Sequence, residues 1–133
     1  MTEKIRIQDL PITDAFLRQK RLIQERGELA LIEDGEPFRH LGYFSLKKGK
    51  GYYRGGHYHQ RKVEHFYIIS GKIRVLFVDL ESGEKSDVLL HAGQRVAIYP
   101  QCAHRFMALK EAQVIEYYDA HYDPEDDVPY EDF

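Results

Sequence analysis

Three histidines and one glutamate have the residue types and the spacing of a transition-metal site. His57 and His59 lie two apart in a segment typical of a strand, so their side chains point to the same face. Glu64 begins the next expected strand, and His104 begins a later one. Imidazole together with carboxylate suits divalent iron, manganese, nickel, copper or zinc. We therefore predict one divalent transition metal bound by these four residues, and the lack of cysteine ligands argues against a structural zinc site.

The segments that must position these residues are short, rich in β-branched and aromatic side chains, and separated by glycines and turns. Such a pattern indicates an all-β sandwich or barrel. Turns are expected at Gly71 and over residues 81–84, and the stretch around residues 12–24 allows a short helix. Strands are expected at residues 29–33, 40–46, 53–59, 64–70, 72–79, 86–90, 94–99, 104–108 and 113–119.

Composition limits the classes of function. The chain has 133 residues, the size of one domain, and its one cysteine, Cys102, cannot form an intrachain disulfide. No apolar run has the length of a membrane span and the first residues do not resemble a signal peptide, so we expect a cytoplasmic protein without a membrane partner. Residues 119–133 hold seven acidic and no basic side chains, whereas the rest carries 19 basic and 15 acidic ones. The acidic stretch argues against nucleic-acid binding, and the basic remainder suits either an anionic small molecule or an ordinary solvated surface.

The histidine pair also belongs to a longer motif. Gly51, His57, His59, Glu64 and Gly71 reproduce the first cupin motif, G-x5-H-x-H-x4-E-x6-G. The chain therefore resembles the cupins, and the resemblance implies a single-domain jelly-roll β-barrel that holds a metal inside it.

The second cupin motif, G-x5-P-x-G-x2-H-x3-N, is matched less closely. Gly93 and His104 agree with it, whereas Tyr99, Gln101 and Ala108 replace its proline, glycine and asparagine. The resemblance thus implies that His104 completes the metal-ligand set, while the turn before it differs from the family pattern.

A narrower resemblance covers residues 26–133. The segments 26–29, 54–59 and 121–133 are similar to the nucleotide-sugar 3,4-ketoisomerases, which are cupins related to the dehydrorhamnose 3,5-epimerases. In that family the paired histidines are the acid and base, and an arginine and a tyrosine help bind the sugar nucleotide; Arg54 and Tyr43 stand in the corresponding places. The family forms dimers that exchange N-terminal strands, which implies a homodimer with residues 1–25 as an exchanged extension of the barrel at residues 26–133.

Two mechanisms remain open at this point. The resembling ketoisomerases work without metal and generally lack the glutamate, whereas this chain keeps Glu64 and His104. If a metal is bound, His57 and His59 use their lone pairs on it, and a tyrosine such as Tyr43 or a metal-bound hydroxide has to move the proton.

The leading hypothesis is a sugar or nucleotide-sugar isomerase or epimerase that transfers a proton next to a carbonyl. Arg54 and Arg61 bracket the histidine pair and are expected to bind a phosphate or carboxylate, and Phe106 shares the inward face of His104 as a cavity wall. The alternatives are an iron-dependent cupin oxygenase, which oxygen consumption would favour, and a non-catalytic cupin that only binds a small ligand.

Overall fold

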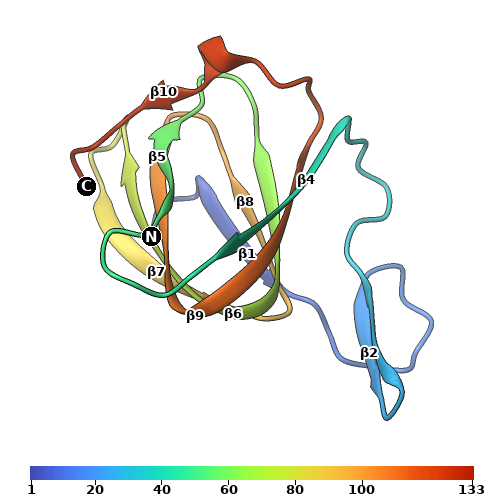
Figure 1. Cartoon of the computed structure of the whole chain (residues 1–133). Helices are drawn as coiled ribbons and strands as arrows, with labels where there is room; N and C mark the ends of the chain where they lie inside the picture. The colour runs from blue at the N-terminus through green and yellow to red at the C-terminus, as the bar shows by residue number, and fades with distance from the viewer.

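The structure, a computed structural model, describes residues 1–133 as ten strands and one turn of 3-10 helix (Figure 1). The prediction of an all-β chain is confirmed. The elements in chain order are β1 (Ile5–Asp9), β2 (Lys20–Gln24), β3 (Gly27–Leu31), β4 (His40–Leu46), β5 (Arg54–Tyr58), β6 (Glu64–Asp79), β7 (Lys85–His91), β8 (Gln94–Ile98), β9 (Cys102–Tyr118), η1 (Pro124–Asp126) and β10 (Val128–Pro129).

Two long strands organise the barrel. The first half of β6 and the second half of β9 pair with each other between β8 and β4, and β1 is added beyond β8. The second half of β6 and the first half of β9 pair with each other between β7 and β5, and β10 is added beyond β5. All these pairs are antiparallel, so β6 and β9 bend from one face of the barrel into the other (Figure 1).

Gly71 lies at this bend and not in a turn, so the predicted division into strands 64–70 and 72–79 is wrong. β6 continues through Gly71, whose φ of +92° few side chains tolerate, and the register with β9 shifts on both sides of it. A Cβ atom at this position would lie 2.3 Å from the Glu111 carbonyl oxygen. Glycine is therefore required here both by the backbone conformation and by the close approach of β9. The loop at residues 81–84, in contrast, connects β6 to β7 as predicted.

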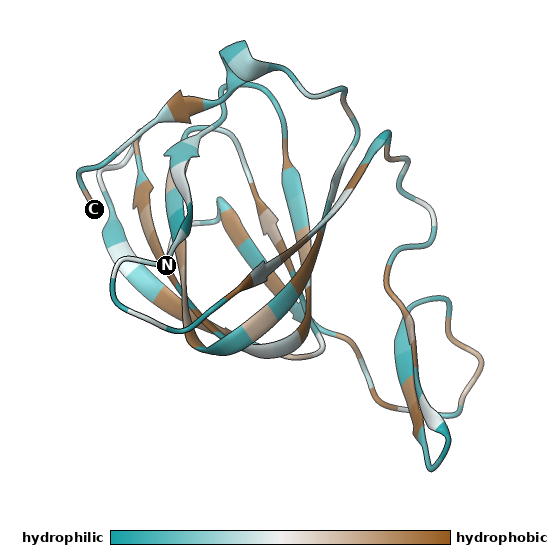
Figure 2. Cartoon of the chain, in the orientation of Figure 1, coloured by the Kyte–Doolittle hydropathy of each residue, from teal (hydrophilic) through white to brown (hydrophobic).

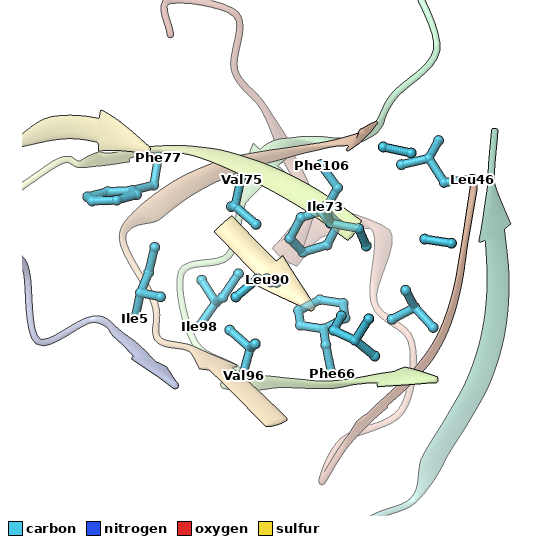
Figure 3. Close-up of a cluster of buried hydrophobic side chains, with 14 of the residues drawn as sticks. Ile5, Leu46, Phe66, Ile73, Val75, Phe77, Leu90, Val96, Ile98 and Phe106 are labelled. Carbon is cyan, nitrogen blue, oxygen red and sulfur yellow. The ribbon is translucent and has the colours of Figure 1, made fainter. Parts of the chain in front are cut away.

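The interior is apolar because side chains alternate along each strand. Phe66 and Ile68 on β6 point inward together with Glu64, as predicted, whereas His65 stacks on Tyr117 on the other face. Figure 3 shows how the side chains from opposite walls meet in the barrel. Fifteen buried residues form this core: Ile5, Leu46, Phe66, Ile68, Ile73, Val75, Phe77, Leu90, Val96, Ile98, Cys102, Phe106, Ala108, Ala112 and Val114.

The N-terminal segment differs from both predictions made for it. Residues 5–9 form β1, which pairs with β8, and Ile5 is part of the core, so a boundary after residue 25 does not separate an extension from the barrel. The stretch at residues 12–24 holds no helix; its end forms β2, which pairs with β3 in a separate two-stranded sheet. No helix of the structure is long and apolar enough to cross a membrane.

The β2–β3 hairpin stands away from the barrel and carries exposed apolar residues (Figures 1 and 2). Its base is held to the barrel by an ion-pair network around Glu33, whose Oε1 lies 2.5 Å from Nη2 of Arg95 on β8. The Tyr117 hydroxyl donates a hydrogen bond to the same oxygen at 3.1 Å, and Gln19 donates one to Oε2 at 3.0 Å. The hairpin is therefore fixed at its base and free at its tip.

Candidate active site

The four predicted metal-ligating residues meet inside one end of the barrel, near η1 and β10. One side-chain atom each from His57, His59, Glu64 and His104 lies within 4.8 Å of the others. His57 on β5 is paired directly with His104 on β9, and Glu64 begins β6, so the barrel closure brings three segments to one point. His57 is partly exposed, whereas the other three residues are buried.

A bulge in β5 allows this arrangement. Arg54 pairs with Phe106 and His57 pairs with His104, so β5 has one more residue than β9 between these two pairs. The extra residue lies in a pair of left-handed glycines, and a Cβ on the first, Gly55, would lie 2.8 Å from the His104 carbonyl oxygen. In a regular strand, residues three apart face opposite sides; the bulge turns both Arg54 and His57 toward the cavity.

The Nε2 atoms of the three imidazoles surround a single carboxylate oxygen, Oε1 of Glu64. The separations are 2.7 Å for His59, 3.1 Å for His104 and 4.0 Å for His57. Nε2 of His104 is buried and makes no hydrogen bond despite this short distance. A buried nitrogen without a partner is costly in an apolar interior, so hydrogen bonds within the chain do not satisfy every polar atom of this cluster.

The Nδ1 atoms point the other way, each toward a group that only accepts hydrogen bonds. The His59 Nδ1 lies 2.7 Å from the Asp126 carbonyl oxygen, and the His104 Nδ1 lies 3.0 Å from the Cys102 carbonyl oxygen. The His57 Nδ1 lies 2.7 Å from Oδ1 of Asp127. Each Nδ1 therefore carries its hydrogen. Nε2 of His59 donates a second hydrogen bond to Glu64 when this ring is protonated, whereas the neutral His57 ring turns its Nε2 lone pair toward the carboxylate.

The pKa values of the cluster follow from burial and from the short distances between the three imidazoles and the Glu64 carboxylate. Burial, together with nearby His104, lowers the pKa of His57 to about 4, so this ring is neutral at physiological pH. Burial alone would lower the pKa of His59, but its hydrogen bond to Glu64 outweighs burial and raises the pKa. Burial alone would raise the pKa of Glu64, but His104 and His59 hold it well below its ordinary range. The cluster thus keeps an ionised carboxylate in the interior.

The cluster forms the floor of an open cavity of about 280 Å³. Two cationic side chains, Arg54 and Lys62, reach this cavity. The Lys62 ammonium lies 3.9 Å from the centre of the Tyr118 ring. Burial raises the pKa of Tyr118 to about 12. The lining residues beyond the four of the cluster are His40, Phe44, Arg54, Gly55, Lys62, Phe66, Phe106, Glu116, Tyr118, Tyr122 and Asp127.

Of the other predicted site residues, the structure brings two into the cavity and leaves two outside. Arg54 and Phe106 line the cavity, as predicted. Tyr43 lies on the outer face of β4 with 58% of its surface exposed, because its even-numbered neighbours on that strand face inward. Arg61 pairs with Asp123 at 2.6 Å and lines a separate cavity. The assignments of Tyr43 to catalysis and of Arg61 to substrate binding in this cavity are therefore corrected.

Two groups of site residues were not predicted from the sequence. Asp126 and Asp127 contact the Nδ1 atoms of His59 and His57, and His40 and Glu116 line the same cavity. Asp126 and Asp127 belong to the acidic stretch at residues 119–133, and nothing in its composition shows that it folds back over the histidines. His40 and Glu116 could have been found, because each is a titratable residue that follows the alternation of the inward-facing residues of its strand.

Solved structures with the same fold are sugar-nucleotide enzymes. QdtA, a sugar 3,4-ketoisomerase from Thermoanaerobacterium thermosaccharolyticum in complex with TDP, is 16% identical; the match covers 100% of this chain and 93% of that one, with a TM-score of 0.78. The dTDP-4-dehydrorhamnose 3,5-epimerase from Sulfolobus tokodaii is 19% identical; the match covers 96% of this chain and 77% of that one, with a TM-score of 0.74. The TDP-fucose-3,4-ketoisomerase WlaRA from Campylobacter jejuni is 13% identical, with 93% and 87% covered and a TM-score of 0.72.

These likenesses confirm the predicted cupin jelly-roll barrel and, at the level of the fold, the resemblance to ketoisomerases and epimerases. No curated protein matches the sequence. A family model described as the polysaccharide biosynthesis C-terminal domain matches residues 25–129, which is more than three quarters of the chain and includes the whole histidine and glutamate cluster. The protein thus belongs to the polysaccharide biosynthesis C-terminal domain family.

Proposed function

We propose that this protein is a metal-dependent isomerase or epimerase of a nucleotide-linked sugar, working by proton transfer next to a carbonyl. The observation that carries the proposal is the convergence of three Nε2 atoms and one buried carboxylate on the floor of an open cavity. The proteins of the same fold support the substrate class, since one of them was crystallised with TDP-4-keto-6-deoxyglucose.

The donor set fits one divalent transition metal. His57, His59, Glu64 and His104 would hold it, because their Nε2 and carboxylate atoms already face one another while each Nδ1 is oriented by an acceptor behind it. Iron, manganese, nickel, zinc and copper are all compatible with these ligand types. A bound divalent ion supplies Lewis-acid stabilisation of the negative charge that develops on a carbonyl oxygen when the neighbouring carbon is deprotonated.

The cavity suits the sugar part of such a substrate. Its volume of about 280 Å³ is just below the range for small-ligand sites, roughly 300–1,000 Å³, so a nucleotide would extend out of it. Arg54 and Lys62 supply positive charge for the phosphates, and Phe44 and Phe106, whose ring centres lie 6.1 Å apart, supply an apolar wall. His57 and His59 cannot act as free bases while their Nε2 lone pairs bind a metal.

The direct test is exchange of a substrate hydrogen with deuterium from solvent, starting with dTDP- and UDP-linked 4-keto sugars. We expect exchange in the metal-loaded protein, its loss on treatment with a chelator and its recovery on addition of metal. Exchange that persists without metal and disappears in His57→Asn would instead make His57 a free base. Oxygen uptake by the iron-loaded protein without exchange would indicate an oxygenase, and ligand-induced stabilisation without turnover a binding protein.

A homodimer is the second part of the proposal. One face of the β2–β3 hairpin presents Leu22, Leu29 and Leu31, and Leu29 is 50% exposed. A two-stranded hairpin is marginally stable alone, so a second chain covering this face would stabilise it. The neighbouring groove of about 580 Å³, lined by Leu31, Phe38 and Leu41 among others, offers an apolar surface for the hairpin of the partner.

We expect light scattering to give twice the chain mass of 15.7 kDa. Leu29→Lys should shift the protein toward monomer, because it places a charge on the apolar face, whereas Leu89→Lys, at a similarly exposed site on β7, should not. A monomer across concentrations for the unchanged protein would contradict the proposal. Deleting residues 1–25 would not isolate the contribution of the hairpin to the dimer, because it would also remove β1 from the barrel.

A further inference from the structure

We propose that His40 and Glu116 form the acid–base pair that moves the substrate proton, with Nδ1 of His40, the ring nitrogen that does not face Glu116, as the atom that takes it and returns it. The assignment rests on the proposed function, because it names the general base. The metal-ligating histidines cannot act as that base while their Nε2 lone pairs bind the metal. Both side chains line the cavity whose floor is the metal-binding cluster, and they come from β4 and the second half of β9.

The geometry is that of an imidazole supported by a carboxylate. His40 Nε2 lies 3.4 Å from Oε2 of Glu116, and the two side chains are 29% and 28% exposed, so they reach the cavity without being fully solvated. The imidazole ring stacks on Tyr118, with ring centres 4.1 Å apart and planes within 5° of each other. Stacking fixes the ring, and the carboxylate next to Nε2–H stabilises the imidazolium that forms when Nδ1 accepts a proton.

Gly42 makes room for this pair. It is opposite Glu116 in the β4–β9 register, and its backbone is not in the left-handed region, so the chain does not need glycine here for its conformation. A Cβ at this position would lie 3.0 Å from Cγ of Glu116 and 3.3 Å from Nε2 of His40. The missing side chain therefore allows a diagonal contact between His40 and Glu116 across two strands.

The other titratable groups of the cavity are less suited to the task. Asp127 is occupied by His57, and Arg54 and Lys62 are cations that cannot accept a proton. Tyr118 keeps its proton at neutral pH, since burial raises its pKa to about 12. Imidazole is the side chain whose ordinary pKa lies nearest to neutrality, which is the condition for efficient proton transfer in both directions.

The proposed step balances as follows. The C–H bond next to the substrate carbonyl breaks, its electron pair forms a carbon–carbon double bond while the carbonyl π pair moves to oxygen, and the proton moves to His40 Nδ1, which leaves an enediolate. In the second half an enediolate oxygen re-forms a carbonyl, the electron pair of the double bond forms a new C–H bond, and His40 returns the proton to that carbon. In a keto shift the hydroxyl proton passes to the former carbonyl oxygen. The imidazole is neutral again at the end, and no oxidant or reductant is consumed.

The experiment compares solvent-deuterium exchange in the metal-loaded full chain with that in His40→Asn and Glu116→Gln. We expect the turnover number for exchange to fall at least about 100-fold in His40→Asn and less in Glu116→Gln, while KM and metal content per chain stay within twofold. A substrate deuterated at the reacting carbon should show a larger primary isotope effect in His40→Asn, because proton transfer becomes more strongly rate-limiting. His91→Asn makes the same change at a histidine that is 62% exposed and outside the cavity, and should exchange like the unchanged protein.

Gly42→Ala is the second variant, since it retains both groups and forces them apart. We expect roughly a tenfold loss of exchange at full metal content, in line with a misplaced general base. Exchange by His40→Asn within threefold of the unchanged protein would overturn the assignment and leave the proposed function intact. Loss of metal in His40→Asn would also overturn it, by showing a structural role. Absence of exchange in the unchanged protein, with metal bound, would overturn the proposed function and this assignment together.

Discussion

Glu64→Gln is expected to release the metal and to abolish activity while the barrel stays folded. Changes to groups that only orient a metal ligand already cost roughly 10–100-fold in metal affinity, so removal of the one carboxylate that faces all three Nε2 atoms should cost more than about 100-fold. Elemental analysis after dialysis measures metal per chain, and solvent-deuterium exchange measures activity. The substitution keeps the size of the side chain, and the apolar core around Phe66 does not depend on its charge.

Two further variants make this result specific. Glu3→Gln applies the same change to an exposed glutamate and should retain full metal content and activity. Asp127→Asn leaves all four ligating residues in place and weakens the acceptor behind Nδ1 of His57, so we expect an intermediate loss of roughly 10–100-fold in affinity. Equal metal content in Glu64→Gln and in the unchanged protein would show that the metal-ligating residues are misassigned.

Gly71→Ala is expected to be the most destabilising single change in the barrel. Its Cβ would lie 2.3 Å from the Glu111 carbonyl oxygen and 2.6 Å from Cα of Ala112, and both are backbone atoms that cannot move without separating β6 from β9. The positive φ adds to the cost of this clash. We expect the free energy of unfolding to fall by about 4 kcal/mol or more, as measured by urea denaturation. Domains of this kind have only about 5–15 kcal/mol in total, so much of the chain would be unfolded at physiological temperature.

Gly83→Ala separates the two causes of that loss. Gly83 has a similar φ of +82°, but a Cβ there would have no atom within 4 Å. Its cost should therefore be the conformational one alone, about 1–2 kcal/mol. Similar losses in Gly71→Ala and Gly83→Ala would mean that the approach of β9 to Gly71 contributes little to stability.

The cluster was predictable because it depends on local alternation and on a few distinctive residue types. His57 and His59 are two apart, and the distances of Gly51, Glu64 and Gly71 from them reproduce a known motif. The positions of most strands followed from β-branched and aromatic composition in the same way. These signals lie within a short stretch of sequence, so they can be recognised without knowing which segments pair.

The features that failed depend on contacts between distant segments. Gly71 looks like a turn when β6 is considered alone, and becomes a bulge only through its pairing with β9. Asp126 and Asp127 orient two imidazoles because the chain returns across the barrel end after β9, which no local pattern indicates. Tyr43 was placed by resemblance, and the register of β4 turns it away from the cavity.

The sharing of β6 and β9 between both faces of the barrel has a consequence for how the molecule folds and unfolds. Neither face can detach alone, because each contains half of the same two strands, and pairs such as Ile5 with Ile98 join residues that are far apart in the sequence. A topology dominated by such non-local contacts folds slowly and in one cooperative step. Glu64 and His104 lie on these shared strands, so we expect the histidine and glutamate cluster to be lost together with the barrel and not in a separate unfolding transition.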